Sequence, residues 1–165
     1  MICTIISSGR EAAIKCRSET SEPYTAIKKK LRDIIIQSYC EGYDEFFVNC
    51  EYGIPLWTAE IICEMKKSVG IKLRVVAPHE EHCRGWNDER RDRYYAVQVQ
   101  ADSFEYACYD YAENCYDIAD ELMLEKSDRL IIFGKRNDKP YSAEYAKRRK
   151  IPTRFIGYAE PLRPV

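Results

Sequence analysis

Both histidines of the chain lie in residues 79–83 (HEEHC), together with a cysteine. Imidazole and thiolate groups are ligands that zinc binds in proteins, and three of them at this spacing could hold the ion. A charged, solvated loop in which His79 takes an aromatic position is the alternative interpretation. No second Cys/His pair stands nearby in the sequence, so we predict no metal.

Two charged side chains are candidates for contacts with a polar ligand. Arg10 follows an apolar run at residues 2–7, and a guanidinium can donate two parallel hydrogen bonds to a phosphate. Glu60 lies one turn into an expected helix, from which a carboxylate could contact a ribose or act as a base. For each residue the alternative is a solvated surface charge.

Two basic runs, residues 28–30 (KKK) and 147–150 (KRRK), raise the question of nucleic acid, as do the 13 tyrosines. The first run is flanked by apolar helix positions, and the second ends a helix, where cations complement the helix dipole. Solvated helix faces explain both runs, so nucleic acid is not an expected partner. Tyrosines 106, 109, 111 and 116 bracket a loop and could stack on a base, although aromatic packing explains them equally.

No sequence signature of catalysis is present. The chain contains no G-x-S-x-G elbow, no Walker loop and no G-x-G-x-x-G fingerprint. No catalytic residue is therefore predicted, and whether the protein is an enzyme stays open.

Composition describes an ordinary globular protein. The chain has 165 residues, of which 45% are hydrophobic and 32% charged, and its net charge is -1. These values predict one domain over residues 1–165 and give no general attraction to nucleic acid or to anionic membranes. The first residues lack the features of a signal peptide, and the eight cysteines are scattered without a C-x-x-C pair. We expect a reduced, cytoplasmic protein without a membrane segment.

Short apolar runs alternate with helical patterns along the whole chain. Strands are expected at residues 2–7, 45–49, 71–77, 103–108, 129–133 and 153–158. Helices are expected between residues 22 and 41, 55 and 69, 88 and 99, 113 and 126, and 141 and 149, with Asn87 as the cap of the third.

This alternation predicts the α/β class. The expected architecture is a three-layer Rossmann-like fold, with a mostly parallel sheet of five to seven strands and helices on both faces. Ligands of such sheets bind outside the carboxyl ends of the strands. The loops at residues 7–10, 49–55, 78–86, 109–114 and 134–140 are therefore the places to search.

Several of these loops carry recognisable residues. Gly9 and Arg10 follow the first strand, and Gly53 precedes residues 56–61 (LWTAEI). Together with later matches, this set resembles the YpsA-like branch of the SLOG superfamily, Rossmann-like proteins that include cytokinin-activating phosphoribohydrolases and the DNA-processing protein DprA. The later matches are Pro78, Glu80, Trp86, Cys115-Tyr116, residues 127–131 (SDRLI) and residues 145–147 (YAK).

The chain departs from this branch where phosphate would bind. Asn49 and Cys50 stand where the branch has two glycines, and Glu51 and Tyr52 replace small or apolar residues. Glycine-rich loops bind phosphate through bare backbone N–H groups, which side chains and a carboxylate would obstruct. Further departures are Pro55 for an aspartate, Ala119-Asp120 for an Arg-Asn pair, and residues 137–139 (NDK) for Gly-Gly-Thr.

The resemblance implies a module that binds or senses a nucleotide derivative and whose phosphate loops are degenerate. Its ligand-binding residues would be Gly9, Arg10, Gly53, Trp57 and Glu60. Two alternatives stay open: a hydrolase of nucleotide N-glycosidic bonds, and a non-catalytic protein-interaction scaffold with exposed tyrosines. The expected partner is a nucleotide-derived small molecule, no cofactor is predicted, and a homo-oligomer is compatible with the sequence.

Overall fold

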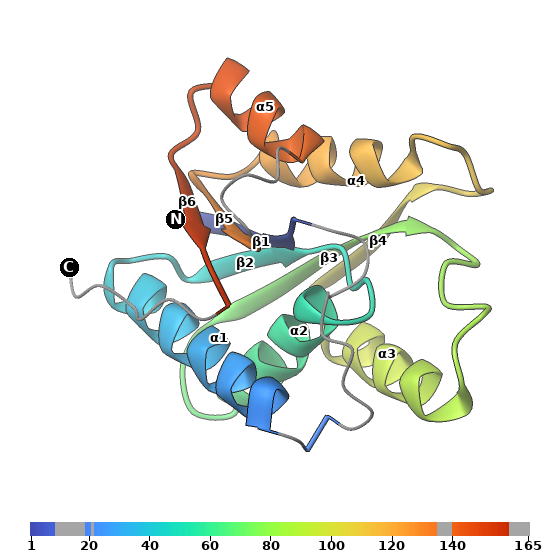
Figure 1. The fold of residues 1–165 in the computed structure, drawn as a ribbon, viewed down its shortest axis with the longest axis horizontal. Helices are drawn as coiled ribbons and strands as arrows, with labels where there is room; N and C mark the ends of the chain where they lie inside the picture. Colours follow the sequence, from blue (N-terminus) through green and yellow to red (C-terminus); the bar gives the residue numbers. More distant parts are fainter. Residues whose placement is uncertain (9–18, 21, 135–139, 159–165) are drawn as a thin grey trace.

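The computed structural model describes residues 1–8, 19–20, 22–134 and 140–158. Within these residues, six strands form one sheet in the order β4-β3-β2-β1-β5-β6, and every neighbouring pair is parallel (Figure 1). The predicted mostly parallel sheet of five to seven strands is confirmed. The strands are β1 (Ile2–Ser7), β2 (Glu45–Val48), β3 (Lys72–His79), β4 (Ser103–Cys108), β5 (Arg129–Phe133) and β6 (Thr153–Ile156).

Helices cover both faces of the sheet, as the three-layer prediction requires. Figure 1 shows α1 (Glu22–Cys40), α2 (Ile54–Met65) and α3 (Asp88–Gln100) on one face. It shows α4 (Cys115–Leu124) and α5 (Tyr141–Arg148) on the other. The first three connections carry the chain outward from β1 to β4. The connection through α4 then returns it to β5, beside β1.

The central strands are apolar because both of their faces are covered. β1 and β5 pair from Cys3 with Arg129 to Ser7 with Phe133, and most residues of this pair are fully buried. On the α1 to α3 face the core includes Leu31, Phe46 and Trp57. On the α4 and α5 face it includes Phe47, Val76 and Met123.

Several element ends differ from the predictions, and β6, for example, ends at Ile156 rather than at residue 158. β3 continues to His79, which pairs with Cys108 of β4, so Pro78 lies in a strand and the following loop begins later. α2 ends at Met65 because the chain turns there, with the Ser68 N–H donating to the Met65 carbonyl at 2.9 Å. α4 begins at Cys115 rather than at residue 113. The predicted cap of α3 is confirmed: Asn87 Oδ1 accepts the Arg90 N–H at 3.0 Å.

Candidate functional site

The strand order reverses at β1, whose neighbours are β2 on one side and β5 on the other. In open parallel sheets, ligands bind outside the carboxyl ends of the strands at such a switch point. The ends of β1 and β5 are held close, with the Ser8 N–H donating to the Phe133 carbonyl at 2.8 Å. Gly134 follows with φ 153, and a Cβ there would lie 1.6 Å from Ser8 Oγ. Only glycine fits this position.

A hollow of about 160 Å³ lies at this point, and we call it the switch-point hollow. Its lining comes from the end of β1, the loop after β2 and the first turns of α4 and α5. Four segments distant in the sequence therefore meet there. Its polar lining residues are Ser7, Ser8, Asn49, Glu51, Tyr116, Asp117, Asp120 and Tyr141.

The described lining of the hollow is acidic. It contains three carboxyl groups and, among the described residues, neither lysine nor arginine. Burial, followed by the negative charge of Glu51, raises the pKa of Asp120 to about 7. The nearby charge of Asp117 adds to this rise, while the hydroxyl of Ser142 opposes it. A carboxyl group with such a pKa is partly protonated at neutral pH and can donate a hydrogen bond as well as accept one.

Polar atoms without partners gather at the same place. Ser7 Oγ and Asp120 Oδ1 are shielded from solvent, and neither has a partner in hydrogen-bonding geometry. Ser142, next to Tyr141 on α5, is fully buried and does not line the hollow, and its hydroxyl acts on the Asp120 carboxyl group. A buried polar group left unpaired costs roughly 1–3 kcal/mol. Atoms of this kind often mark the position of a water molecule or ligand.

The loop after β2 has its own internal contacts. Asn49 is buried, and its Oδ1 accepts the backbone N–H of Glu51 at 3.1 Å. Its Nδ2 lies 3.4 Å from Glu51 Oε2. Cys50 has φ 54, a left-handed conformation that favours glycine. This is one of the two positions at which the resembled branch carries glycine.

The start of α2 offers few donors to an anion. Gly53 caps the helix with φ 108, and Pro55 has no N–H. The Leu56 N–H donates to the Glu51 carbonyl at 3.0 Å. Helix N-termini bind phosphate through free N–H groups, so this one is poorly equipped to do so.

The five predicted ligand-binding residues are not brought together within the described structure. Gly9 and Arg10 lie outside the described residues. Gly53 caps α2, and Trp57 is buried with its ring 5.2 Å from that of Tyr24. Glu60 accepts two hydrogen bonds from Arg93, at 2.6 and 2.8 Å.

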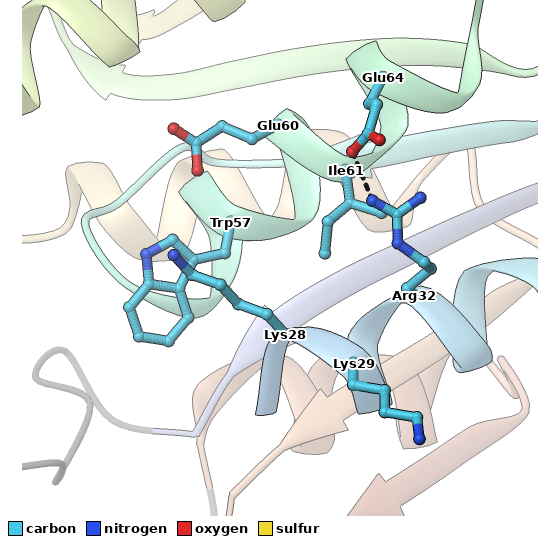
Figure 2. A pocket seen from close by; sticks show the side chains of 7 residues that line it. All are labelled: Lys28, Lys29, Arg32, Trp57, Glu60, Ile61 and Glu64. Carbon is cyan, nitrogen blue, oxygen red and sulfur yellow. Dashed lines mark hydrogen bonds and ion pairs between the residues drawn. The ribbon is translucent and has the colours of Figure 1, made fainter. Parts of the chain in front are cut away.

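Trp57 and Glu60 line a second hollow of about 350 Å³ between α1 and α2. Figure 2 shows Lys28 alongside the indole, and its Nζ lies 5.2 Å from the ring centroid. Farther along, Arg32 pairs with Glu64. The two hollows share no lining residue.

Glu19 connects several elements near the second hollow. It accepts from Lys28 at 2.7 Å and from Arg93 at 2.9 Å, and the Tyr52 hydroxyl also donates to it. Burial alone would raise the pKa of Glu19, but these hydrogen bonds, Arg93 foremost, lower it to about 2. Arg93 thus bridges Glu19 and Glu60, and this gives both carboxylates a structural role.

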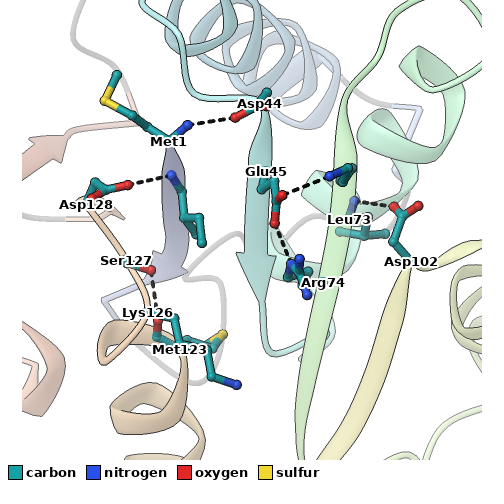
Figure 3. A network of polar contacts seen from close by, with 12 residues as sticks. Met1, Asp44, Glu45, Leu73, Arg74, Asp102, Met123, Lys126, Ser127 and Asp128 are labelled. Carbon is teal, nitrogen blue, oxygen red and sulfur yellow. Dashed lines mark hydrogen bonds and ion pairs between the residues drawn. The ribbon is translucent and has the colours of Figure 1, made fainter.

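Carboxylates at the amino edge of the sheet have partners for the oxygen atoms described next, in contrast to Asp120 Oδ1. The N-terminal ammonium of Met1 donates to Asp44 Oδ1 at 2.7 Å (Figure 3). Asp128 accepts the Ile2 N–H, and Asp102 accepts the Leu73 N–H, both at 2.8 Å. The unpaired carboxyl oxygen at the switch point is therefore not a general feature of this sheet.

The histidines of residues 79–83 pack against aromatic rings, in line with His79 taking an aromatic position, while Glu80 and Glu81 between them are exposed. The His82 ring lies 4.8 Å from Tyr94 and 5.4 Å from Trp86, centroid to centroid. Burial lowers the pKa of His82 to about 4. Among the described residues, no three metal-binding side chains lie close enough to hold an ion.

Two further observations on the described part of the chain concern its cysteines and the length of its helices. Its seven cysteines are free, and burial raises the pKa of Cys3 to about 12. No helix among the described residues is long and apolar enough to cross a bilayer.

Sequence reasoning did not identify Ser7, Asp117, Asp120 or Tyr141 as lining residues. Asp120 drew notice only as a departure from the Arg-Asn pair of the resembled branch. That departure was a signal, because it replaces a potential cation with a carboxyl group. Ser7 begins one of the loops named as places to search, whereas Asp117 and Tyr141 carry no local signal and become lining residues only through the topology.

Comparison with known proteins places these features in a family. The model of the YspA SLOG family matches residues 6–154. Two UPF0398 proteins of Staphylococcus aureus, from strains JH9 and JH1, are each 27% identical to the chain over 116 residues. The match covers 68% of this chain, which spans 62% of the length of these relatives. Since the family model covers most of the chain, including both sides of the switch point, the protein belongs to the YspA SLOG family.

Proposed function

We propose that this protein binds a nucleotide-derived small molecule in the switch-point hollow and acts as a binding or sensing module. The position of the hollow carries this proposal, because it lies where Rossmann-like sheets take their ligands. Membership of the YspA SLOG family supports a nucleotide-related module. The unpaired atoms of Ser7 and Asp120 supply polar groups that a ligand would satisfy.

The proposed ligand is recognised mainly through uncharged polar groups. Glu51, Asp117 and Asp120 line the hollow, and a phosphate among them would meet negative charge. Two like charges 4 Å apart repel by about 1 kcal/mol in water and about 4 kcal/mol at the effective dielectric of a protein surface. Binding of ordinary mononucleotides is therefore expected to be weak.

The predicted anchors have different roles in this proposal. Gly9 and Arg10 follow β1, whose end lines the hollow, so we assign them direct contact with the ligand. Gly53 would set the turn into α2. Trp57 and Glu60 would support that helix from the opposite side, through the aromatic packing and the Arg93 ion pair.

A panel of the four common ribonucleosides and their 5′-monophosphates tests the proposal. Ligands that bind the folded state raise the melting temperature, and calorimetry then gives the dissociation constants. We expect at least one nucleoside to bind, and its monophosphate to bind less tightly. Failure of every compound to bind would contradict the proposed function.

A hydrolase of N-glycosidic bonds is the second candidate, and the state of Asp120 favours it. A carboxyl group whose pKa is about 7 can act as a general acid at neutral pH. In this reaction the C1′–N bond breaks, and its electron pair goes to the base nitrogen, which takes the Asp120 proton. Water adds to C1′ and releases its proton to Glu51.

Chromatography of the same incubations tests this candidate by measuring the free base. We expect base release that is lost in Asp120→Ala and retained in Asp92→Ala, which changes an exposed carboxylate on α3. If nucleosides bind and no base is released, the protein is a binding module only.

A further inference from the structure

We propose that the switch-point hollow is a sugar subsite, which recognises the vicinal hydroxyl groups of a ribose through Ser7 and Asp120. This inference rests on the proposed function and deepens it, because it names the part of the ligand that the hollow holds.

The size of the hollow suits a single sugar ring. Pockets that enclose complete drug-sized ligands measure roughly 300–1,000 Å³. The switch-point hollow, at about 160 Å³, is about half the lower figure. It can therefore hold one ring of a nucleoside, with the remainder of the ligand outside it.

The polar groups of the hollow match hydroxyl groups better than they match an ion. A hydroxyl group both donates and accepts, so it can pair with an unpaired serine hydroxyl and with a carboxyl group in either protonation state. Ser7 Oγ and Asp120 Oδ1 are two shielded atoms without partners, and both residues line the hollow. Each would gain a partner from a polyol.

Two other ligand classes fit less well. A phosphate would face Glu51 and Asp117, and the N–H of Glu51 is already bonded to Asn49. A metal ion would need a close group of three ligating side chains, which is absent from the described residues. A carboxylate beside a ribose hydroxyl is, by contrast, the way in which many dinucleotide-binding folds recognise the sugar.

Free sugars test the subsite without any contribution from a base. Ligand-observed saturation-transfer NMR would compare D-ribose with 2-deoxy-D-ribose, each with the complete protein. Loss of a hydroxyl leaves buried polar groups unpaired, so we expect the deoxy sugar to bind about tenfold more weakly. Inorganic phosphate, added as a competitor at constant ionic strength, should not displace D-ribose.

Variants assign the effect to the hollow. Ser7→Ala removes one oxygen atom and should weaken D-ribose binding several-fold while preserving the melting temperature. Asp120→Ala should weaken it further, and Asp120→Asn provides a smaller change at the same position if Asp120→Ala does not fold. Asp92→Ala, on the exposed face of α3, is the control and should bind like the unchanged protein.

Three results would overturn the inference: equal binding of the two sugars, displacement of D-ribose by phosphate, or unchanged binding in Ser7→Ala. Its failure is distinguishable from failure of the proposed function. Nucleosides that bind without regard to the 2′-hydroxyl overturn the sugar subsite alone. Ribose binding without binding of any nucleoside or nucleotide overturns the proposed function alone.

Discussion

Asn49 Oδ1 accepts a hydrogen bond from the backbone N–H of Glu51 at 3.1 Å, at the carboxyl end of β2. A phosphate loop would present this N–H to an oxygen of its ligand. Here the N–H of Glu51 already donates to the side chain of Asn49. Cys50 adopts a left-handed backbone conformation, which a glycine would adopt without strain. The backbone conformation of a phosphate loop is thus partly kept, while its N–H donor is bonded to a side chain of the same loop.

Restoring a bare loop should restore phosphate binding. The triple change Asn49→Gly, Cys50→Gly and Glu51→Ala frees the N–H and removes one carboxylate. We expect a monophosphate to bind at least several-fold more tightly than to the unchanged protein, since a charged repulsion of about 1 kcal/mol is lost. Calorimetry with a monophosphate and its nucleoside isolates the phosphate contribution.

Arg10 provides the control for this gain. Adding Arg10→Ala to the triple variant should abolish the improvement if the guanidinium grips the phosphate. Tight binding of a monophosphate by the unchanged protein, dependent on its phosphate, would contradict this account of the loop.

Asp120 should make stability depend on pH. Its pKa is about 7 in the folded protein and near 4 in an unfolded chain. A group with a raised folded-state pKa contributes stability that is complete below the unfolded value and is lost as pH rises through the folded value. Stability should therefore decline between about pH 4 and pH 7 from this group.

Asp120→Asn removes the charge while keeping the shape. It should raise the melting temperature at pH 8, by roughly 2–4 °C for each kcal/mol of relieved burial cost, and change it little at pH 4. Asp92→Asn is the exposed control. A melting temperature of Asp120→Asn that shifts equally at both pH values would show that Asp120 is not the titrating group.

Gly134→Ala should destabilise the protein. Its Cβ would overlap Ser8 Oγ, and its φ of 153 strains any other residue. We expect a loss of roughly 2–4 kcal/mol in the free energy of unfolding, measured by urea denaturation. Adding Ser8→Gly should recover the part due to the clash. Gly85→Ala, where nothing lies within 4 Å, should change little.

Arg93→Met should expose the cost of removing a partner from Glu60 and one of several partners from Glu19. Arg93 donates to Glu19 and Glu60, so its loss should lower the free energy of unfolding by about 1–3 kcal/mol at pH 7. The pKa of Glu19 is lowered to about 2, so its contribution exists above about pH 4 and is lost as pH falls toward 2. Arg93→Met should therefore reduce the loss of stability that occurs as pH falls from about 4 toward 2. Arg91→Met, which breaks an exposed pair with Asp88, should have little effect.

The fold was readable from the sequence because its signals are local. Residues 2–7 and 129–133 are continuous apolar runs, as strands covered on both faces must be, and they form the central pair β1 and β5. Asn87 marked the start of α3 through a side-chain cap. That residues 1–165 form a single domain stays a prediction.

The site was much less readable, because its residues come from separate segments. Ser7, Asp120 and Tyr141 meet only when α4 returns the chain from β4 to β5 beside β1. The amphipathic pattern of α2 also did not show that Glu60 would be bound by Arg93 of α3. Such pairings depend on which helices become neighbours, and this information is not contained in either helix alone.

The central claim is that a nucleotide-derived ligand occupies the switch-point hollow, and backbone NMR of labelled protein tests it most directly. Titration with the tightest-binding ribonucleoside should shift the amide signals of Ser7, Asn49 and Asp120 in a saturable manner. The signals of Lys28 and Glu64, beside the second hollow, should change little. Saturable shifts confined to residues of α1 and α2, with those of Ser7 and Asp120 unmoved, would contradict the account.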